Sequence, residues 1–475
     1  MPIPTEQLEK PAVHKQEQSH IASFRRVLKN RHFLLLWMAQ LISLSVLNAA
    51  NFGVIVLVND LTHSVFMAGL AIIAFTLPAV PFSVVAGVIV DRLNKRFVLW
   101  VSNMLRMATM LLLVVSLLID RTSLWPLYVL TFVTSLIGQF FVPAEGSSIP
   151  LLVGERDLMP ALSLVNISLT LSQAIGFLLL GRLAATLFPP FILHLGPLTL
   201  AVQSIDMLFV VVAFFYLVCA VLILCIPASA FKEKHIHTSN SKGTHIGLKE
   251  ALEMLWDDMV EGWRVVRSDR LLFFSVIQLS VVGIIMLLIG ELAGAFVQQV
   301  LHRPAADMSI VLAPAGIGLV GASVLMPRIT ERIDKIRLTT IGFIGLAVGF
   351  VLLPASQWLV LHLDPRHGAE SPLLLWTTVI LVLLLGAAMA CVNIPTQTIM
   401  QERAPEESRA RVLALQFMVY NAGSIPVLLF AGAMVQLVGF NQLVILLSVS
   451  LLLFCWWGSR YVREAPFKRL HEKNS

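Results

Sequence analysis

Long apolar segments separated by short polar loops run through almost the whole chain. About 20 predominantly apolar residues are enough for a helix to cross the hydrocarbon core of a membrane. Segments of this kind lie at residues 32–58, 64–90, 97–119, 124–143, 160–187, 204–226, 271–299, 307–327, 337–361, 373–395, 411–437 and 441–461. The pattern predicts an all-α membrane protein with twelve transmembrane helices.

The composition agrees with a membrane protein. Of the 475 residues, 57% are hydrophobic and only 13% are charged, whereas a soluble domain carries about a quarter charged residues. Residues 1–31 and 462–475 are polar and are expected to form tails. The first tail lacks the basic start, short apolar core and small-residue cleavage site of a signal peptide, so we expect none.

The distribution of basic residues predicts the orientation. The 34 Lys and Arg residues lie in or beside the two tails and the even-numbered loops, with five exceptions: Arg121, Arg303 and Arg366 in the other loops, and Arg106 and Arg182 within spans. Short cytoplasmic loops carry such an excess of basic residues. We therefore expect a multi-pass protein of the plasma membrane with both termini in the cytoplasm. The net charge of +6 then reflects topology and not binding of nucleic acid.

One long polar segment, residues 227–270, divides the chain into halves at 32–226 and 271–461. Its first part, 232–247, is rich in Lys, His, Ser and Thr and is expected to be a flexible linker. Its second part predicts an amphipathic helix on the cytoplasmic face, because apolar residues recur at three- and four-residue steps. They are Leu248, Leu252, Leu255, Trp256, Met259, Trp263 and Val266.

Neither enzymatic chemistry nor a metal site is indicated. No nucleotide-binding Gly-x(4)-Gly-Lys-Ser/Thr string and no nucleophile turn occur. The four cysteines lie within apolar spans without the spacing of a metal site or disulfide framework. A His cluster in the linker has no acidic or Cys partner, which favours solvated histidines (His235, His237 and His245). We expect no catalytic residue, no cofactor and no metal.

The two halves repeat each other. Loop strings at 143–158, after the fourth predicted helix, have counterparts at 393–412, after the tenth. The loop at 328–335 occupies the place that 91–96 has in the first half. Paired loops about 240–250 residues apart indicate two duplicated six-helix units.

A charged loop stands out at residues 91–96, where Asp-Arg-x-x-Lys-Arg follows an apolar helix. Charges this dense mark a membrane surface, and Gly87, four residues earlier, lets another helix pack closely. The string resembles the loop signature between helices 2 and 3 of the major facilitator superfamily. Asn94 replaces a Gly usual in that family, and Asn tolerates left-handed backbone nearly as well.

Other strings are similar to the multidrug and siderophore exporter branch of that superfamily, the drug:proton antiporters. They lie at 143–161, 260–264 and 409–412. The resemblance implies two pseudo-symmetric six-helix bundles around a central cavity, the major facilitator fold. It also implies secondary transport by a monomer, with a small-molecule substrate and the lipid bilayer as its partners.

The resemblance further implies a conformational latch. In the superfamily the aspartate of the charged loop pairs with the cytoplasmic start of helix 11, here Arg409 or Arg411. We expect this pair to stabilise the outward-open state and to break when the cytoplasmic side opens. The latch residues are Gly87, Asp91, Arg92, Lys95, Arg96, Arg409 and Arg411.

Ionisable residues inside the spans are costly and few, so each is a candidate for coupling. Glu291 lies in helix 7 between small residues and is the first candidate to carry a proton. A structural bond from it to Asn48 or Asn51 is the alternative. Asp206, near the outer end of helix 6, either couples or faces interfacial water. Arg106 in helix 3 either snorkels to the cytoplasmic surface or pairs with an acid from another helix.

Amides concentrate on helices that border the cavity in this superfamily. They could orient a substrate or bond helix to helix. The candidates are Asn48, Asn51, Gln139, Asn166, Gln173, Gln278, Gln298, Asn393, Gln397, Gln416 and Asn421.

The sequence favours export of amphipathic or hydrophobic molecules, because an apolar interior dotted with amides suits them. Helix 1 has no acid between Ser43 and Asn48, and helix 5 lacks the Pro of many antiporters at 176–181. Direction and coupling ion therefore stay open among proton coupling, sodium coupling and uniport. Uptake or exchange of a metabolite is one alternative function, and a non-transporting receptor or scaffold is another.

Overall fold

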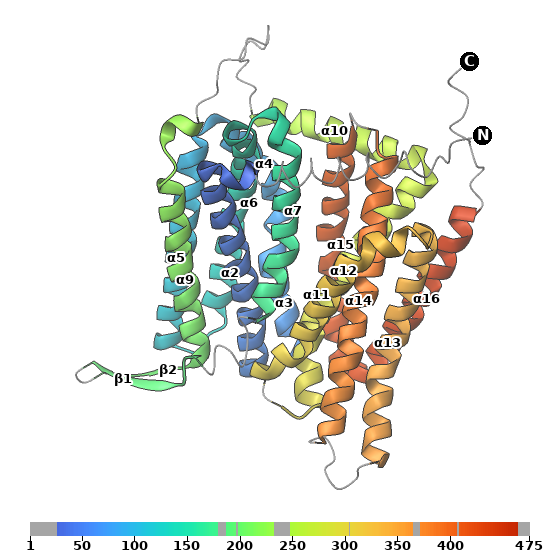
Figure 1. The fold of residues 1–475 in the computed structure, drawn as a ribbon. Coiled ribbons are helices and arrows are strands. Elements are labelled where there is room, and N and C mark those ends of the chain that lie inside the picture. Colours follow the sequence, from blue (N-terminus) through green and yellow to red (C-terminus); the bar gives the residue numbers. More distant parts are fainter. Residues whose placement is uncertain are drawn as a thin grey trace, which may run out of the picture.

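The structure is a computed structural model. It describes residues 26–178, 187–195, 198–231, 248–303, 305–363, 371–405 and 408–463. Two helical bundles stand side by side, the first from blue to green and the second from yellow to red (Figure 1). Helix α10 (Leu248–Ser268) crosses one end of both bundles, which we call the α10 end.

The first bundle contains the helices of the N-terminal half. They are α2 (Arg31–Thr62), α3 (Val65–Thr76), α4 (Ala79–Arg92), α5 (Lys95–Ile119), α6 (Trp125–Leu152), α7 (Glu155–Leu178) and α9 (Ser204–Leu224). The short 3-10 helix η1 (Ala228–Phe231) follows α9 at the α10 end.

The second bundle contains the helices of the C-terminal half. They are α11 (Arg270–Gln299), α12 (Ser309–Thr330), α13 (Lys335–Leu363), α14 (Pro372–Arg403), α15 (Arg409–Val438) and α16 (Phe440–Arg463). The 3-10 helix η2 (Ala305–Met308) precedes α12.

The predicted all-α membrane fold is confirmed, and each predicted span lies on one or two helices. The span 64–90 forms two, α3 and α4, with turn residues at Leu77 and Pro78 between them, because a proline removes a backbone donor. Within the described ranges, ten helices are long and apolar enough to cross a membrane, and Val311–Met326 of α12 is a shorter apolar helix.

Two helices extend beyond the predicted spans. We expected the fourth and tenth spans to end at residues 143 and 395, but α6 continues to Leu152 and α14 to Arg403. Pro143 and Pro395 lie inside these helices. Prolines are tolerated there because neighbouring groups can satisfy the freed carbonyls. The extension brings Glu145 into a helix, which the sequence analysis had placed in a loop.

One element was not predicted. Strands β1 (Phe191–Leu195) and β2 (Leu198–Val202) pair antiparallel, with Phe191 opposite Val202. The hairpin leaves the bundle at the end opposite α10 (Figure 1). The prediction was wrong here because it considered only segments long enough to cross a membrane.

Short polar side chains begin the helices. Asn30 accepts hydrogen bonds from the backbone of His32 and Phe33 at the start of α2, and Asn94 accepts one from Phe97 at the start of α5. Such caps satisfy backbone donors that the helix itself leaves free. Asn94 has a φ of −67°, so it does not use the left-handed backbone that Asn tolerates, and it acts as a cap.

Glycines determine how closely α12 and α14 approach. A Cβ on Gly318 would meet the carbonyl oxygen of Leu383, and one on Gly386 would meet the carbonyl oxygen of Ala315. Backbone therefore touches backbone across this pair of helices. Such contact between small residues is how membrane helices gain packing energy without a hydrophobic driving force.

We predict that Gly318→Ala destabilises the protein whereas Gly321→Ala, one turn along the same helix, does not. A Cβ on Gly321 would meet nothing within 4 Å. Overpacking at Gly318 costs about 1–3 kcal/mol, while Ala gains about 0.5–1 kcal/mol over Gly in a helix. Thermal unfolding of the purified variants should give a lower Tm for Gly318→Ala only. Equal Tm values would contradict the close contact.

Candidate functional site

The two bundles meet closely at the end opposite α10. There α3 packs on α15, and α11 packs on α2 and α3. Gln436 Nε2, near the end of α15, donates to Ser64 Oγ, which caps α3, at 2.6 Å. A Cβ on Gly432 of α15 would lie 2.7 Å from Cα of Phe66. The halves are thus in backbone contact at this end.

Glu291 lies within this contact. Its side chain, on α11, is 1% exposed, and neither carboxylate oxygen has a hydrogen-bond partner among the described residues. A Cβ on Gly69 of α3 would meet its Oε1, and one on Gly432 would lie 3.1 Å from the same atom. Two glycines, one from each half, therefore make the room that the carboxyl occupies.

This environment has a chemical consequence. Burying an ionised carboxylate without a partner costs far more than burying the neutral acid. Closure of α3 and α15 around Glu291 therefore favours the proton-bound carboxyl, and separation of the bundles would return the group to water. Glu291 can link its protonation to the packing of the two halves.

The alternative bond from Glu291 to Asn48 or Asn51 is not formed. Asn48 Nδ2 instead lies 3.4 Å from Ser172 Oγ, joining α2 to α7. The sequence analysis missed another amide, Asn59, which is 2% exposed. Its Nδ2 has no partner among the described residues and lies where a Cβ on Gly294 would be, one turn of α11 beyond Glu291.

Arg106 is buried inside the first bundle, with 2% exposure. Its Nη1 donates to Ser43 Oγ at 3.1 Å, and its guanidinium lies over the rings of Phe141 and Tyr216, at 5.3 and 5.7 Å from their centroids. The option of snorkelling to the surface is wrong. The aromatic faces attract the cation where water cannot.

Glu145, on α6, is a buried acidic residue near Arg106 inside the first bundle. Its side chain is 7% exposed, its Oε1 has no partner among the described residues, and it interacts with the charge of Arg106. The sequence analysis did not find this residue because it ended the fourth span too early.

Asp206 has a structural role. Its Oδ2 lies 2.9 Å from Arg121 Nη1 and accepts from the backbone of Gln203 at 2.8 Å, which caps α9. Both contacts hold the side chain at the start of α9, where the helix dipole also favours negative charge. A coupling role for Asp206 stays a prediction.

The structure describes the surroundings of three latch arginines. Arg411 Nη1 pairs with Glu261 Oε1 of α10 at 2.9 Å, Arg409 is exposed, and Arg96 donates to the carbonyl of Leu224 at the end of α9. The side chain of Asp91 lies outside the part of the chain that the structure describes. The latch itself stays a prediction.

Gly87 does not provide the expected close packing. A Cβ there would meet nothing within 4 Å, since no other helix approaches α4 closely at that point. Gly262 of α10 does face another helix closely, because a Cβ there would lie 3.3 Å from Cβ of Arg411 in α15.

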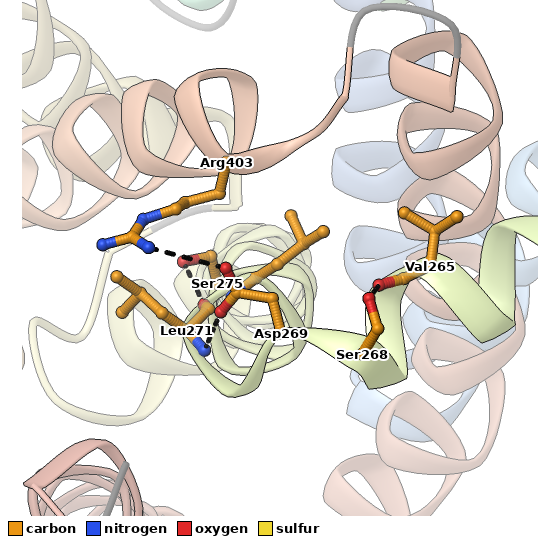
Figure 2. Close-up of polar contacts among 7 residues, drawn as sticks. Val265, Ser268, Asp269, Leu271, Ser275 and Arg403 are labelled. Atoms are coloured by element: carbon orange, nitrogen blue, oxygen red, sulfur yellow. Dashed lines mark hydrogen bonds and ion pairs between the residues drawn. The ribbon is translucent and has the colours of Figure 1, made fainter. Parts of the chain in front are cut away.

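A second ion pair ties the corner between α10 and α11 to the end of α14. Arg403 Nη1 lies 3.6 Å from Asp269 Oδ2, and Asp269 Oδ1 accepts from the backbone of Leu271 at 2.8 Å (Figure 2). Ser275 and Ser268, on either side of this corner, donate to carbonyls of their own helices (Figure 2). Hydrogen bonds within α10 and α11 therefore stabilise the corner between these two helices.

The amide candidates are dispersed. Gln139 and Asn421 donate to carbonyls of their own helices, and Gln278 lines a pocket near the α10 end of the second bundle. Gln416 is buried, whereas Asn51, Gln298 and Asn393 are half-buried and Gln397 is exposed. The side chains of Asn166 and Gln173 lie outside the described part.

An apolar pocket lies inside the second bundle. Its walls come from α11, α12, α13, α14 and α16, and Phe52 of α2 enters it from the first bundle. Phe296, Phe350, Met389 and Phe440 contribute large apolar surfaces. A pocket of this composition can hold an apolar group but offers it no charged partner.

Comparisons with known proteins agree with these features. The sequence profile of the Major Facilitator Superfamily matches residues 36–427. The uncharacterized MFS-type transporter YfiS of Bacillus subtilis (strain 168) is 23% identical over 343 residues, 72% of each chain. The MFS-type transporter YvqJ of the same organism is 23% identical over 360 residues, 76% of this chain and 74% of that protein.

Solved structures share the fold at low identity. The nucleoside transporter NupG superimposes with a TM-score of 0.65 at 12% identity, over 91% of this chain and 100% of that one. A bacterial homologue of the lysosomal transporter Spinster gives a TM-score of 0.62 at 14% identity, over 91% and 97%. With a family profile that matches most of its length, the chain belongs to the Major Facilitator Superfamily.

Proposed function

We propose that this membrane transporter exports amphipathic or hydrophobic small molecules by alternating access, driven by protons that enter through Glu291. The main observation behind this proposal is the buried carboxyl of Glu291. It has no hydrogen-bond partner among the described residues and lies between glycines of the two halves. The narrower assignment to the drug:proton antiporter branch belongs to this proposal. It rests on the strings at 143–161, 260–264 and 409–412.

The orientation of basic loops assigns the α10 end to the cytoplasm. The end at which α3 and α15 meet is then the outer gate, closed in this structure. The Spinster homologue with the same fold was solved in an inward-facing and unoccupied conformation. These observations support an outward-closed state as the one described.

Proton coupling follows from the environment of the carboxyl. While the outer gate is open, water reaches Glu291 and the charged form is stable; when the gate closes, only the neutral form is buried at low cost. A proton taken up from outside therefore favours closure, and its release to the cytoplasmic side favours reopening. A ligand shifts such an equilibrium only by its differential affinity for the two states.

The substrate class follows from the pocket beside this gate. Apolar side chains and the ring of Phe52 line it, so it suits an apolar group better than a sugar or a polyanion. The nucleoside transporter that shares the fold keeps metabolite uptake or exchange as an alternative. A receptor or scaffold would bind a ligand without moving it.

Labelling in intact cells tests the orientation. In a chain without native cysteines, Ser123→Cys, beside Arg121, should react with an impermeant maleimide, because its loop faces outside. Ser241→Cys, beside Lys242, should react only after the cells are opened. Reaction of the second position alone would contradict cytoplasmic termini.

We predict that Glu291→Gln abolishes the response of transport to a pH gradient, since the amide cannot exchange a proton. A dye panel first identifies a substrate, and efflux from proteoliposomes is then compared with and without an inward proton gradient. The wild type should accelerate about tenfold or more, and the Gln variant should not.

Glu145→Gln is the matched control, because it removes another buried glutamate and leaves Glu291 in place. If only this control loses the response, coupling resides beside Arg106 and not at the outer gate. A full response from Glu291→Gln assigns that residue a structural role. Inward accumulation of substrate would support uptake, and binding without flux would support a receptor.

The latch predicts a different phenotype. Asp91→Asn should slow turnover while membrane insertion is unchanged, because the amide cannot pair as an anion with Arg409 or Arg411 in the outward-open state. Asp257→Asn, on the exposed face of α10, is the control and should transport normally. Turnover and protein in the membrane are measured in parallel, and normal turnover of Asp91→Asn would rule the latch out.

A further inference from the structure

A second pocket opens between α11, α13 and α16 near the α10 end. It has a volume of about 390 Å³. Its lining differs from that of the apolar pocket because it includes polar as well as apolar side chains. The residues that matter for its chemistry are Phe274, Gln278, Arg337, Phe343, Cys455 and Ser459.

Stacked aromatic rings support the apolar wall of this pocket. Phe454 lies between Phe274 and Phe343, with ring centroids 5.7 and 5.5 Å away. A Cβ on Gly458 would overlap the ring of Phe274, so this glycine lets the ring lie flat against α16. The wall is rigid and suits an aliphatic chain.

Two groups provide the donors. Arg337 is exposed in the first turn of α13 and makes no ion pair within the described residues. Gln278 is 4% exposed, and its amide has no hydrogen bond to any described group. The hydroxyls of Thr340 and Ser459 already donate to carbonyls of their own helices.

The neighbouring cation is not available. Lys335, two residues before Arg337, is paired with Glu402 at 2.5 Å. Arg337 is therefore the cation that the pocket offers to a ligand. Arg337 is exposed, so its charge lies at the mouth of the pocket. Gln278 is eight residues from the start of α11, which places it about 12 Å along that helix.

The position of this pocket relative to the membrane indicates which class of ligand it can bind. The outer surfaces beside the pocket are apolar, with Ile341 and Trp456 each 54% exposed, as expected for helices that face lipid. The proposed orientation assigns the α10 end to the cytoplasmic leaflet, which is rich in anionic lipids. Basic pockets between transmembrane helices on that side bind lipid head groups.

We propose that this pocket binds one anionic phospholipid. Its phosphate accepts from Arg337, an ester carbonyl accepts from the Gln278 amide, and an acyl chain lies along Phe274 and Phe343. A zwitterionic lipid brings the same phosphate with an ammonium that opposes Arg337, so it binds more weakly. The site is independent of the substrate and coupling ion, and depends on the proposed orientation only for its leaflet.

A thiol in the pocket reports occupancy. Cys455 lines it and is half-buried, so the full chain carrying Cys225→Ser and Cys391→Ser keeps Cys455 as the accessible reporter, because Cys219 is buried. Modification by N-ethylmaleimide is followed in detergent with added phosphatidylglycerol or phosphatidylcholine. Phosphatidylglycerol should slow labelling of Cys455 at a lower concentration than phosphatidylcholine does.

Arg337→Ala should raise the phosphatidylglycerol concentration for half-protection by about fivefold, the contribution of one basic residue at a lipid surface. Arg332→Ala, an exposed arginine in the preceding loop that does not line the pocket, should leave it unchanged. Equal protection by both lipids, or an equal loss in both variants, overturns the proposal. Native mass spectrometry of the same samples should retain one phosphatidylglycerol per chain, and retention of none also overturns it.

Discussion

Hydrocarbon offers no partner to a polar group, and this constraint determines where the charged side chains of this chain lie. The ion pairs Arg411–Glu261 and Arg403–Asp269 lie at the α10 end, and Arg121–Asp206 lies at the other. Between the ends, Arg106 is covered by two aromatic rings and a serine hydroxyl. Glu291 has neither a cation nor a hydrogen bond among the described residues. A group kept at such a cost is a functional candidate by default.

Glycine is the means by which the helices satisfy this constraint and still pack. Gly318 and Gly386 bring two helices of one bundle into backbone contact, where nothing needs to move. Gly69 and Gly432 do the same between bundles, but around a carboxyl. The first contact resembles a permanent core. The contact at Gly69 and Gly432 is smaller, contains a titratable group and joins the two halves. It is therefore the contact that can open at a modest cost in free energy.

The sequence predicted the helices well because hydrocarbon thickness and hydrogen bonding leave few solutions for an apolar segment of about 20 residues. It predicted boundaries poorly where a helix continues past a proline, and ending the fourth span at residue 143 left Glu145 outside α6. It identified Glu291 from burial cost alone, but the glycines facing it come from α3 and α15, far away in the chain. It did not reveal the partner of Asp206, because Arg121 lies in a different loop. Pairing across elements is the information that one sequence does not contain.

The buried glutamates Glu145 and Glu291 differ in what a conformational change can do to them. Glu145 is near Arg106 within one bundle, so its surroundings move with it when the bundles rock. Glu291 has one glycine from each half against it, so opening the gate replaces protein by water on one side of the same carboxyl. Each tenfold difference in proton affinity between the two states shifts their ratio by about 1.4 kcal/mol. In the proposed cycle, only a group at the contact between the two halves can use that difference, and for this reason the proposal assigns coupling to Glu291 of α11 and not to Glu145 within the first bundle.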